Sequence, residues 1–70
     1  MNNGIKRKLQ ELIGKNVDAS FLSGSLYVTY PGNGGIILRI ENDDCVVVKT
    51  EKQGMLYVSI DNIAYIKTDL

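Results

Sequence analysis

The spacing of apolar residues changes at Gly14, and this change constrains the fold more than any other feature. Before Gly14, apolar residues recur every three or four positions, which predicts one amphipathic helix over about residues 4–13. The apolar face comprises Ile5, Leu9, Leu12 and Ile13. Asn3 can cap this helix, and Gly14 is placed to end it in a left-handed conformation.

After Gly14 the apolar period shortens to two, which is typical of half-buried strands. Apolar runs of this kind follow one another from about residue 15 to residue 68, separated by the polar turns "SGS", "NDD" and "EKQG". Asp61 and Asn62 form a very short corner before the last run. The pattern predicts five or six short antiparallel strands.

Residues 30–35 read "YPGNGG" and contain the only proline of the chain. A phosphate-binding loop would need a lysine and a hydroxyl, followed by a helix, and a strand pattern follows instead. Asn33 and Gly34 are the strongest local hairpin signal, and Pro31 suits a turn or an edge. We therefore expect a hairpin with an inserted tip.

A single flat sheet of this length would leave one apolar face in water. We expect residues 1–70 to form one domain, a mainly β fold in which the N-terminal helix precedes a strongly bent small barrel. A core of this size only just outweighs chain entropy. Self-association is therefore expected.

The side-chain inventory argues against enzymatic chemistry. Eight basic and eight acidic residues cancel, and the chain lacks histidine and tryptophan. The commonest general base and metal ligand is therefore missing, and we expect no enzyme activity, no metal and no cofactor. Cys45 is the only cysteine, which favours a reducing, cytoplasmic setting. No apolar run approaches the ~20 residues of a membrane span, so no membrane association is expected.

The order of elements resembles the Sm-like version of the small SH3-like barrel. Its first motif has apolar and polar residues at fixed offsets, matched here by Gly35, Ile37, Ile40, Glu41, Asp44, Cys45 and Val47. Its second motif, a three-residue corner before an apolar strand, is matched by Ile60, Asp61, Asn62, Ile63 and Ile66. The segments "LIGKNVDASFLSG" and "VSIDNIAYI" also resemble a group of small bacterial proteins, a resemblance that implies no activity.

The Sm resemblance implies partners as well as a fold. Sm-like proteins assemble into rings through their last two strands, which here implies an edge formed by Met55, Tyr57, Val58, Ile63, Tyr65 and Ile66. Sm proteins that hold uridine-rich RNA do so with Asn, Asp and Arg, but the matching positions here are Cys45, Glu41 and Asp61. A thiol hydrogen-bonds poorly, and Asp61 repels phosphate. The usual uridine pocket is therefore not expected.

Three readings of function remain open. The first is a non-enzymatic binding or assembly module that self-associates through edge strands. The second is an RNA- or ssDNA-binding module with contacts outside the usual pocket, at Lys6, Arg7, Lys8, Tyr30 and Arg39. The third is an adaptor that accepts a strand of a protein partner at its edge.

Other side chains have a simpler interpretation. Cys45 precedes three valines in a strand and is expected to be buried and inert. Glu41, Asp43 and Asp44 fall at a turn and lack the spacing of a calcium loop. Among the tyrosines, one or both of Tyr27 and Tyr30 are expected at the surface, whereas Tyr57 and Tyr65 are expected to pack partly in the core.

Overall fold

The computed structural model describes residues 3–69 and shows one helix and six strands. The elements are α1 (Asn3–Leu12), β1 (Asn16–Leu22), β2 (Ser25–Tyr30), β3 (Gly35–Glu41), β4 (Cys45–Thr50), β5 (Gly54–Ser59), the 3₁₀ turn η1 (Ile60–Asn62) and β6 (Ile63–Thr68). The mainly β content and the single N-terminal helix confirm the expected class. The side chain of Asn3, the predicted cap, lies outside what the structure describes.

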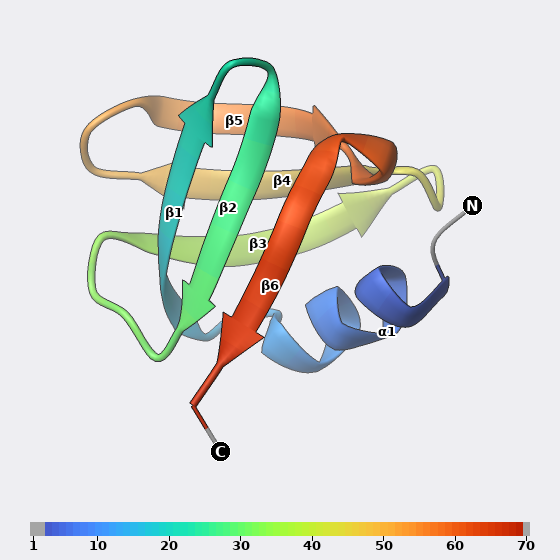
Figure 1. Cartoon of the computed structure of the whole chain (residues 1–70), viewed down its shortest axis with the longest axis horizontal. Helices are drawn as coiled ribbons and strands as arrows, with labels where there is room; N and C mark the ends of the chain where they lie inside the picture. Colours follow the sequence, from blue (N-terminus) through green and yellow to red (C-terminus); the bar gives the residue numbers. More distant parts are fainter. Residues whose placement is uncertain (1–2, 70) are drawn as a thin grey trace.

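The strands lie in the order β5-β4-β3-β1-β2-β6. In space the sheet folds into two crossed layers, β3-β4-β5 behind and β1-β2-β6 in front (Figure 1). Only a short ladder joins the layers, with Asn16 opposite Ile36 and Val17 opposite Gly35. Because β5 and β6 have one neighbour each, the sheet is not closed into a barrel, which corrects the expected small barrel to an open, folded sheet.

The pairing of β6 with β2 is parallel, which corrects the expectation of a wholly antiparallel sheet. The 3₁₀ turn after β5 carries the chain from one layer to the other (Figure 1). Because β5 and β6 belong to different layers, they do not form a hairpin with each other. The direction of β6 is therefore set by its packing beside β2, from Leu26 opposite Ile63 to Tyr30 opposite Thr68.

Three of the predicted turns are confirmed as hairpins between neighbouring strands. Ser23 and Gly24 join β1 to β2, and both adopt positive φ, of 52° and 79°, which matches the right-handed twist of paired strands. The segments 42–44 and 51–53 join β3 to β4 and β4 to β5. Each of these hairpins is a local structure, so its polar residues were sufficient to predict it.

The segment 31–34 does not form the predicted hairpin. It leaves β2, crosses the start of β1, and enters β3 on the other side of β1. Backbone bonds hold the crossing, from Gly32 N–H to Asn16 C=O (3.1 Å) and from Gly34 N–H to Val17 C=O (3.2 Å). Gly32 lies so close to β1 that a Cβ on it would clash with backbone atoms of Val17 and Asp18.

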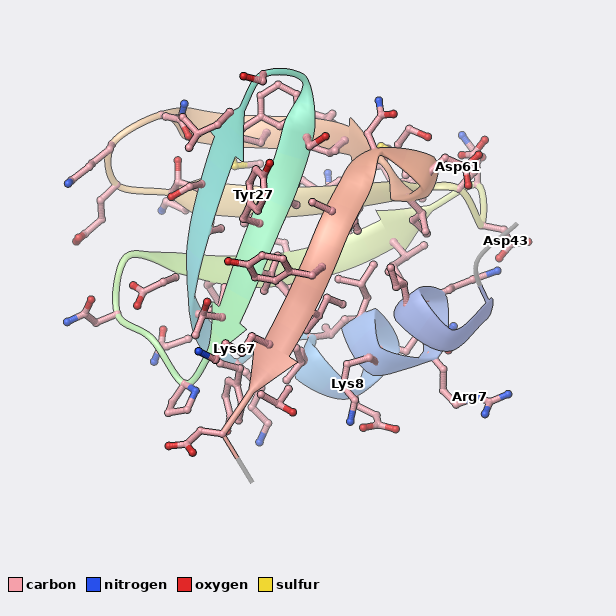
Figure 2. The ribbon with its side chains drawn as sticks, in the orientation of Figure 1. Arg7, Lys8, Tyr27, Asp43, Asp61 and Lys67 are labelled. Atoms are coloured by element: carbon pink, nitrogen blue, oxygen red, sulfur yellow. The ribbon has the colours of Figure 1, made fainter. Side chains whose placement is uncertain are left out.

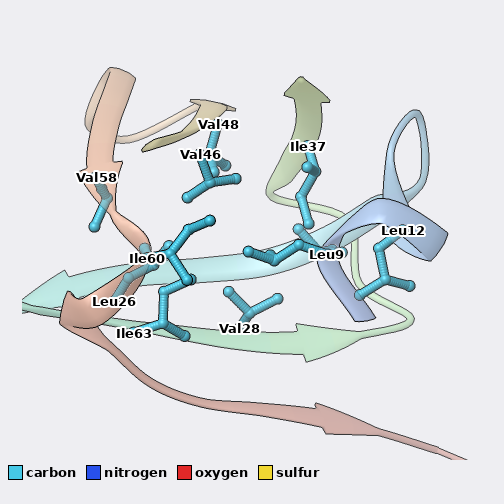
Figure 3. Close-up of a cluster of buried hydrophobic side chains, with 11 residues drawn as sticks. Leu9, Leu12, Leu26, Val28, Ile37, Val46, Val48, Val58, Ile60 and Ile63 are labelled. Carbon is cyan, nitrogen blue, oxygen red and sulfur yellow. The ribbon is translucent and has the colours of Figure 1, made fainter. Parts of the chain in front are cut away.

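The core lies between the two layers and is covered at one end by α1. Leu9 and Leu12 of α1 pack against valines and isoleucines of both layers (Figure 3). Gly14 adopts φ of 82°, as predicted, and its N–H donates to the carbonyl of Ile37 in β3 (2.7 Å). This bond attaches the end of the helix to the sheet. The fully buried residues are Leu9, Val17, Leu26, Val28, Ile37, Val46, Val47 and Val48.

The contact of the crossing segment with β1 predicts that alanine substitution destabilises the protein at one of two neighbouring glycines and not at the other. Gly32→Ala places a methyl group against the backbone of β1, which cannot retreat without breaking the sheet. We expect it to lower the free energy of unfolding by about 1–3 kcal/mol, the range of other overpacked sites, measured by urea denaturation. Gly34→Ala is the matched control. Its Cβ would meet only the Asp18 carboxylate at 3.5 Å, and we expect a change within about 0.5 kcal/mol. Equal costs at the two positions would contradict the crossing.

Candidate functional site

The two ends of the sheet present strand edges that are not paired with another strand. β5 hydrogen-bonds only to β4, and β6 only to β2. The N–H of Ile60 donates to the carbonyl of Asp44 (2.8 Å) and continues the β4–β5 register. Because antiparallel residues face their partner alternately, Val58 and Leu56 then face β4, whereas Tyr57 directs its N–H and C=O outward.

The residues predicted for an oligomer edge divide between surface and core. The side chains of Met55, Tyr57 and Tyr65 are exposed, with Tyr57 at 58% and Tyr65 at 48%. Val58 and Ile63 are buried, and Ile66 packs against the core. The two tyrosines were expected to be partly in the core, and this expectation is wrong, because each lies on the outer face of its layer. An assembly at these edges would use the exposed three.

The helix cations do not form an open basic face. Lys6 Nζ lies 3.2 Å from the carboxylate of Asp43, in the turn between β3 and β4. Lys8 Nζ bonds Glu11 one turn later at 2.9 Å. Arg7 is exposed and points away from the sheet (Figure 2). The positive charges of Lys6 and Lys8 are thus largely balanced by neighbouring carboxylates.

The remaining two residues of the predicted nucleic-acid surface lie elsewhere. Arg39 is on β3, where its Nε bonds the Glu41 carboxylate at 2.7 Å. This hydrogen bond raises the pKa of Arg39 above its ordinary value, and the nearby Tyr57 hydroxyl adds to the effect. Tyr30 is half-buried and packs against the core. Tyr30 and Lys8 line one surface cavity of about 200 Å³. Arg39, on β3, does not line this cavity.

One aromatic pair was not predicted. Tyr27 and Tyr65 lie opposite each other on β2 and β6, and their rings meet edge to face with centroids 5.3 Å apart. Tyr27 lies on the front of the β1-β2-β6 layer (Figure 2). Because the two residues are 38 positions apart and their strands pair in parallel, no local pattern could have shown the contact.

The positions that correspond to the Sm uridine contacts lie near one end of β4. Glu41 is opposite Cys45 in the β3–β4 ladder, and Cys45 is opposite Ser59 in the β4–β5 ladder. Asp61 follows in η1 and is exposed. Cys45 is partly buried, with its Sγ 3.9 Å from the carbonyl of Val46. Glu41 is already bonded to Arg39.

A second polar region lies where the two layers separate. Beyond Val17, β1 has no ladder to β3, and the turn between β4 and β5 comes beside it. The side chain of Gln53 in this turn bonds both peptide groups of Phe21. The Phe21 N–H donates to Gln53 Oε1 (3.2 Å), and Gln53 Nε2 donates to the Phe21 carbonyl (3.4 Å). The amide of Gln53 thus replaces a neighbouring strand, a contact that the sequence analysis missed.

Two adjoining surface cavities flank this region. The first, of about 290 Å³, is lined by residues of β1, the crossing segment and the β4–β5 turn. The second, of about 280 Å³, lies beside Ile36 and Lys49. Asn33, Thr50 and Glu51 border both cavities. This is the place where "YPGNGG" contributes to a surface rather than to a hairpin.

No group of three or more potential metal ligands occurs within residues 3–69. In the same part of the chain, no helix is long and apolar enough to cross a membrane. Comparisons of the chain with protein-family models, curated proteins and solved structures return no match.

The Gln53 contact yields a prediction about stability. Gln53→Glu keeps an acceptor for the Phe21 N–H but directs a carboxylate at the Phe21 carbonyl. We expect a loss of about 0.5–1.5 kcal/mol in the free energy of unfolding at pH 7, the range for one hydrogen bond. The repulsion raises the pKa of the new carboxyl in the folded state. The deficit should therefore shrink as pH falls through this raised pKa towards about 4, where the acid is protonated and can donate to the carbonyl.

Gln10→Glu is the matched control, because it makes the same charge change on an exposed helix position. Urea denaturation measures the free energy of unfolding of both variants and the wild type at pH 7 and pH 4. A deficit for Gln53→Glu no larger than that of Gln10→Glu would show that the amide contact with Phe21 contributes nothing.

Proposed function

We propose that the chain is a non-enzymatic assembly module of the Sm-like kind, in which β5 of one copy pairs with β6 of the next. The observation that carries the proposal is that the sheet ends in two open strands. Such a module would act in a reducing, cytoplasmic compartment, where Cys45 stays a free thiol.

The composition of the edges supports this function. Proteins that avoid edge pairing protect an edge strand with charges, proline or bulges. β5 reads "GMLYVS" and has none of these protections along its six residues. Its outward-facing Tyr57 has an exposed ring. A partner strand would therefore find both backbone groups and apolar surface on β5.

The other edge is more sheltered but compatible. β6 reads "IAYIKT" and carries one charge, Lys67. Helix α1 contacts both β3 and β6, so a strand added to β6 must pass the helix. β5 and β6 are the two outermost strands of the same sheet. Pairing of β5 in one copy with β6 in the next would therefore continue the sheet from molecule to molecule.

The mass of the purified protein tests the proposal. We expect static light scattering to give a mass several times the 7.8 kDa of one chain. Tyr57→Pro should reduce this mass to that of a monomer, because proline removes the outward N–H while the inward ladder to β4 is kept. A wild-type monomer at high concentration would overturn the proposal.

Tyr57→Thr is the matched control, since it loses the ring but keeps the N–H and a strand-forming side chain. Circular dichroism checks that both variants fold. If Tyr57→Pro folds and keeps the wild-type mass, then β5 is not the assembly edge.

The same purified protein can be used to test the hypothesis of nucleic-acid binding. A ratio of absorbance at 260 and 280 nm typical of free protein, together with no retention of a single-stranded oligonucleotide at low salt, would dismiss RNA or ssDNA as a partner. If binding occurs, changing Lys6, Arg7 and Lys8 to Glu should weaken it. A monomer that recovers one protein partner would instead favour the adaptor reading.

A further inference from the structure

The free edge of β1 presents peptide groups in a regular series. In the β1–β2 ladder, residues alternate between those that face β2 and those that face away. Phe21 faces away, because both its N–H and its C=O bond Gln53. Val17 also faces away, since its carbonyl accepts from Gly34. Ala19 lies midway between them on the same strand, so its N–H and C=O point to the same side.

Ala19 is the one position of this series whose peptide groups have no partner within residues 3–69. The β1–β3 ladder ends at Val17, and the Gln53 amide reaches only Phe21. The side chain of Ala19 packs against the core, whereas the residue also lines the 290 Å³ cavity. The donor and acceptor of Ala19 therefore open into that cavity.

The molecule itself shows which chemical group fits such a position. Gln53 presents an N–H donor and a C=O acceptor side by side, and these satisfy the C=O and N–H of Phe21. Ala19 repeats the same pair two residues earlier in the strand. A second carboxamide is thus the chemical complement of the open position, whereas a carboxylate has no donor and an amine has no acceptor.

The rest of the cavity is polar and of mixed charge. Asp18, Glu51 and Lys52 line it together with Ser20, Asn33 and Thr50. Two parts of the wall are held in place: the Asp18 carboxylate accepts from the Asn33 N–H (3.2 Å), and the Glu51 N–H donates to the Gly34 carbonyl (3.0 Å). The wall on this side is therefore formed before a ligand arrives, which reduces the ordering cost of binding.

From these contacts we propose that the cavity beside Ala19 is a binding site for a small molecule with a primary carboxamide, or a ring with adjacent N–H and C=O. The carboxamide pairs with the N–H and C=O of Ala19, and its body occupies the space between Asp18 and the β4–β5 turn. The site is separate from the β5 and β6 edges, so it does not depend on self-association.

Nicotinamide is a suitable probe, and amide NMR spectra of the ¹⁵N-labelled protein report its position. We expect saturable shifts of the Ala19 N–H, and smaller shifts at Gly34 and Glu51, at concentrations on the order of millimolar, as befits a ligand of this size. N,N-dimethylnicotinamide keeps the ring and the carbonyl but lacks the donor. It should need at least about ten times the concentration for the same shift.

Two variants examine the pairing directly. Ala19→Pro removes the N–H that faces the cavity and leaves the β2 side of the strand intact, so it should abolish the response at Gly34 and Glu51. Gln53→Ala exposes the Phe21 pair, and nicotinamide should then shift Phe21 as well as Ala19. This second variant keeps the test valid if Ala19→Pro does not fold. Equal shifts with the two compounds, or no saturable shift at Ala19, would overturn the proposal.

Discussion

The contact of the crossing segment with the start of β1 is the constraint on which the rest of the structure depends. Gly32 touches the backbone of β1 so closely that no side chain is possible there, and flanking bonds to Asn16 and Val17 hold it. The crossing places β2 and β3 on opposite sides of β1. As a result β1 belongs to both layers, β2 has a free side that accepts β6, and β5 is left at the other end.

The surface of this fold offers a partner unpaired backbone groups more than unpaired charges. Lys6, Lys8 and Arg39 each pair with a carboxylate, so these three positive charges are balanced locally. Unpaired peptide groups, in contrast, occur at the sheet ends and along β1. Hydrogen bonding by such groups depends less on salt than ion pairing does. Recognition by this protein is accordingly expected to follow the shape and hydrogen-bonding pattern of a partner.

The sequence predicts the elements of this fold better than their arrangement. The helix, the change of period at Gly14 and the hairpins at 23–24, 42–44 and 51–53 are local features, and each follows from residues close in the chain. The "NG" of residues 33–34 carries a hairpin signal too, but the pairing of β1 with both β2 and β3 overrides it. The contacts of Gln53 with Phe21 and of Tyr27 with Tyr65 join residues that are distant in the chain, so local sequence patterns do not predict them.

The parallel pairing of β2 with β6 has a consequence for the order of folding. Strands β3, β4 and β5 are joined by short turns, so their ladders close small loops and cost little chain entropy. The β2–β6 ladder joins residues 26–30 to residues 63–68 and closes a much longer loop. Non-local parallel pairing is slow to form. The pairing of β6 with β2, which brings the two tyrosines together, is therefore expected to form last, after the hairpins of both layers.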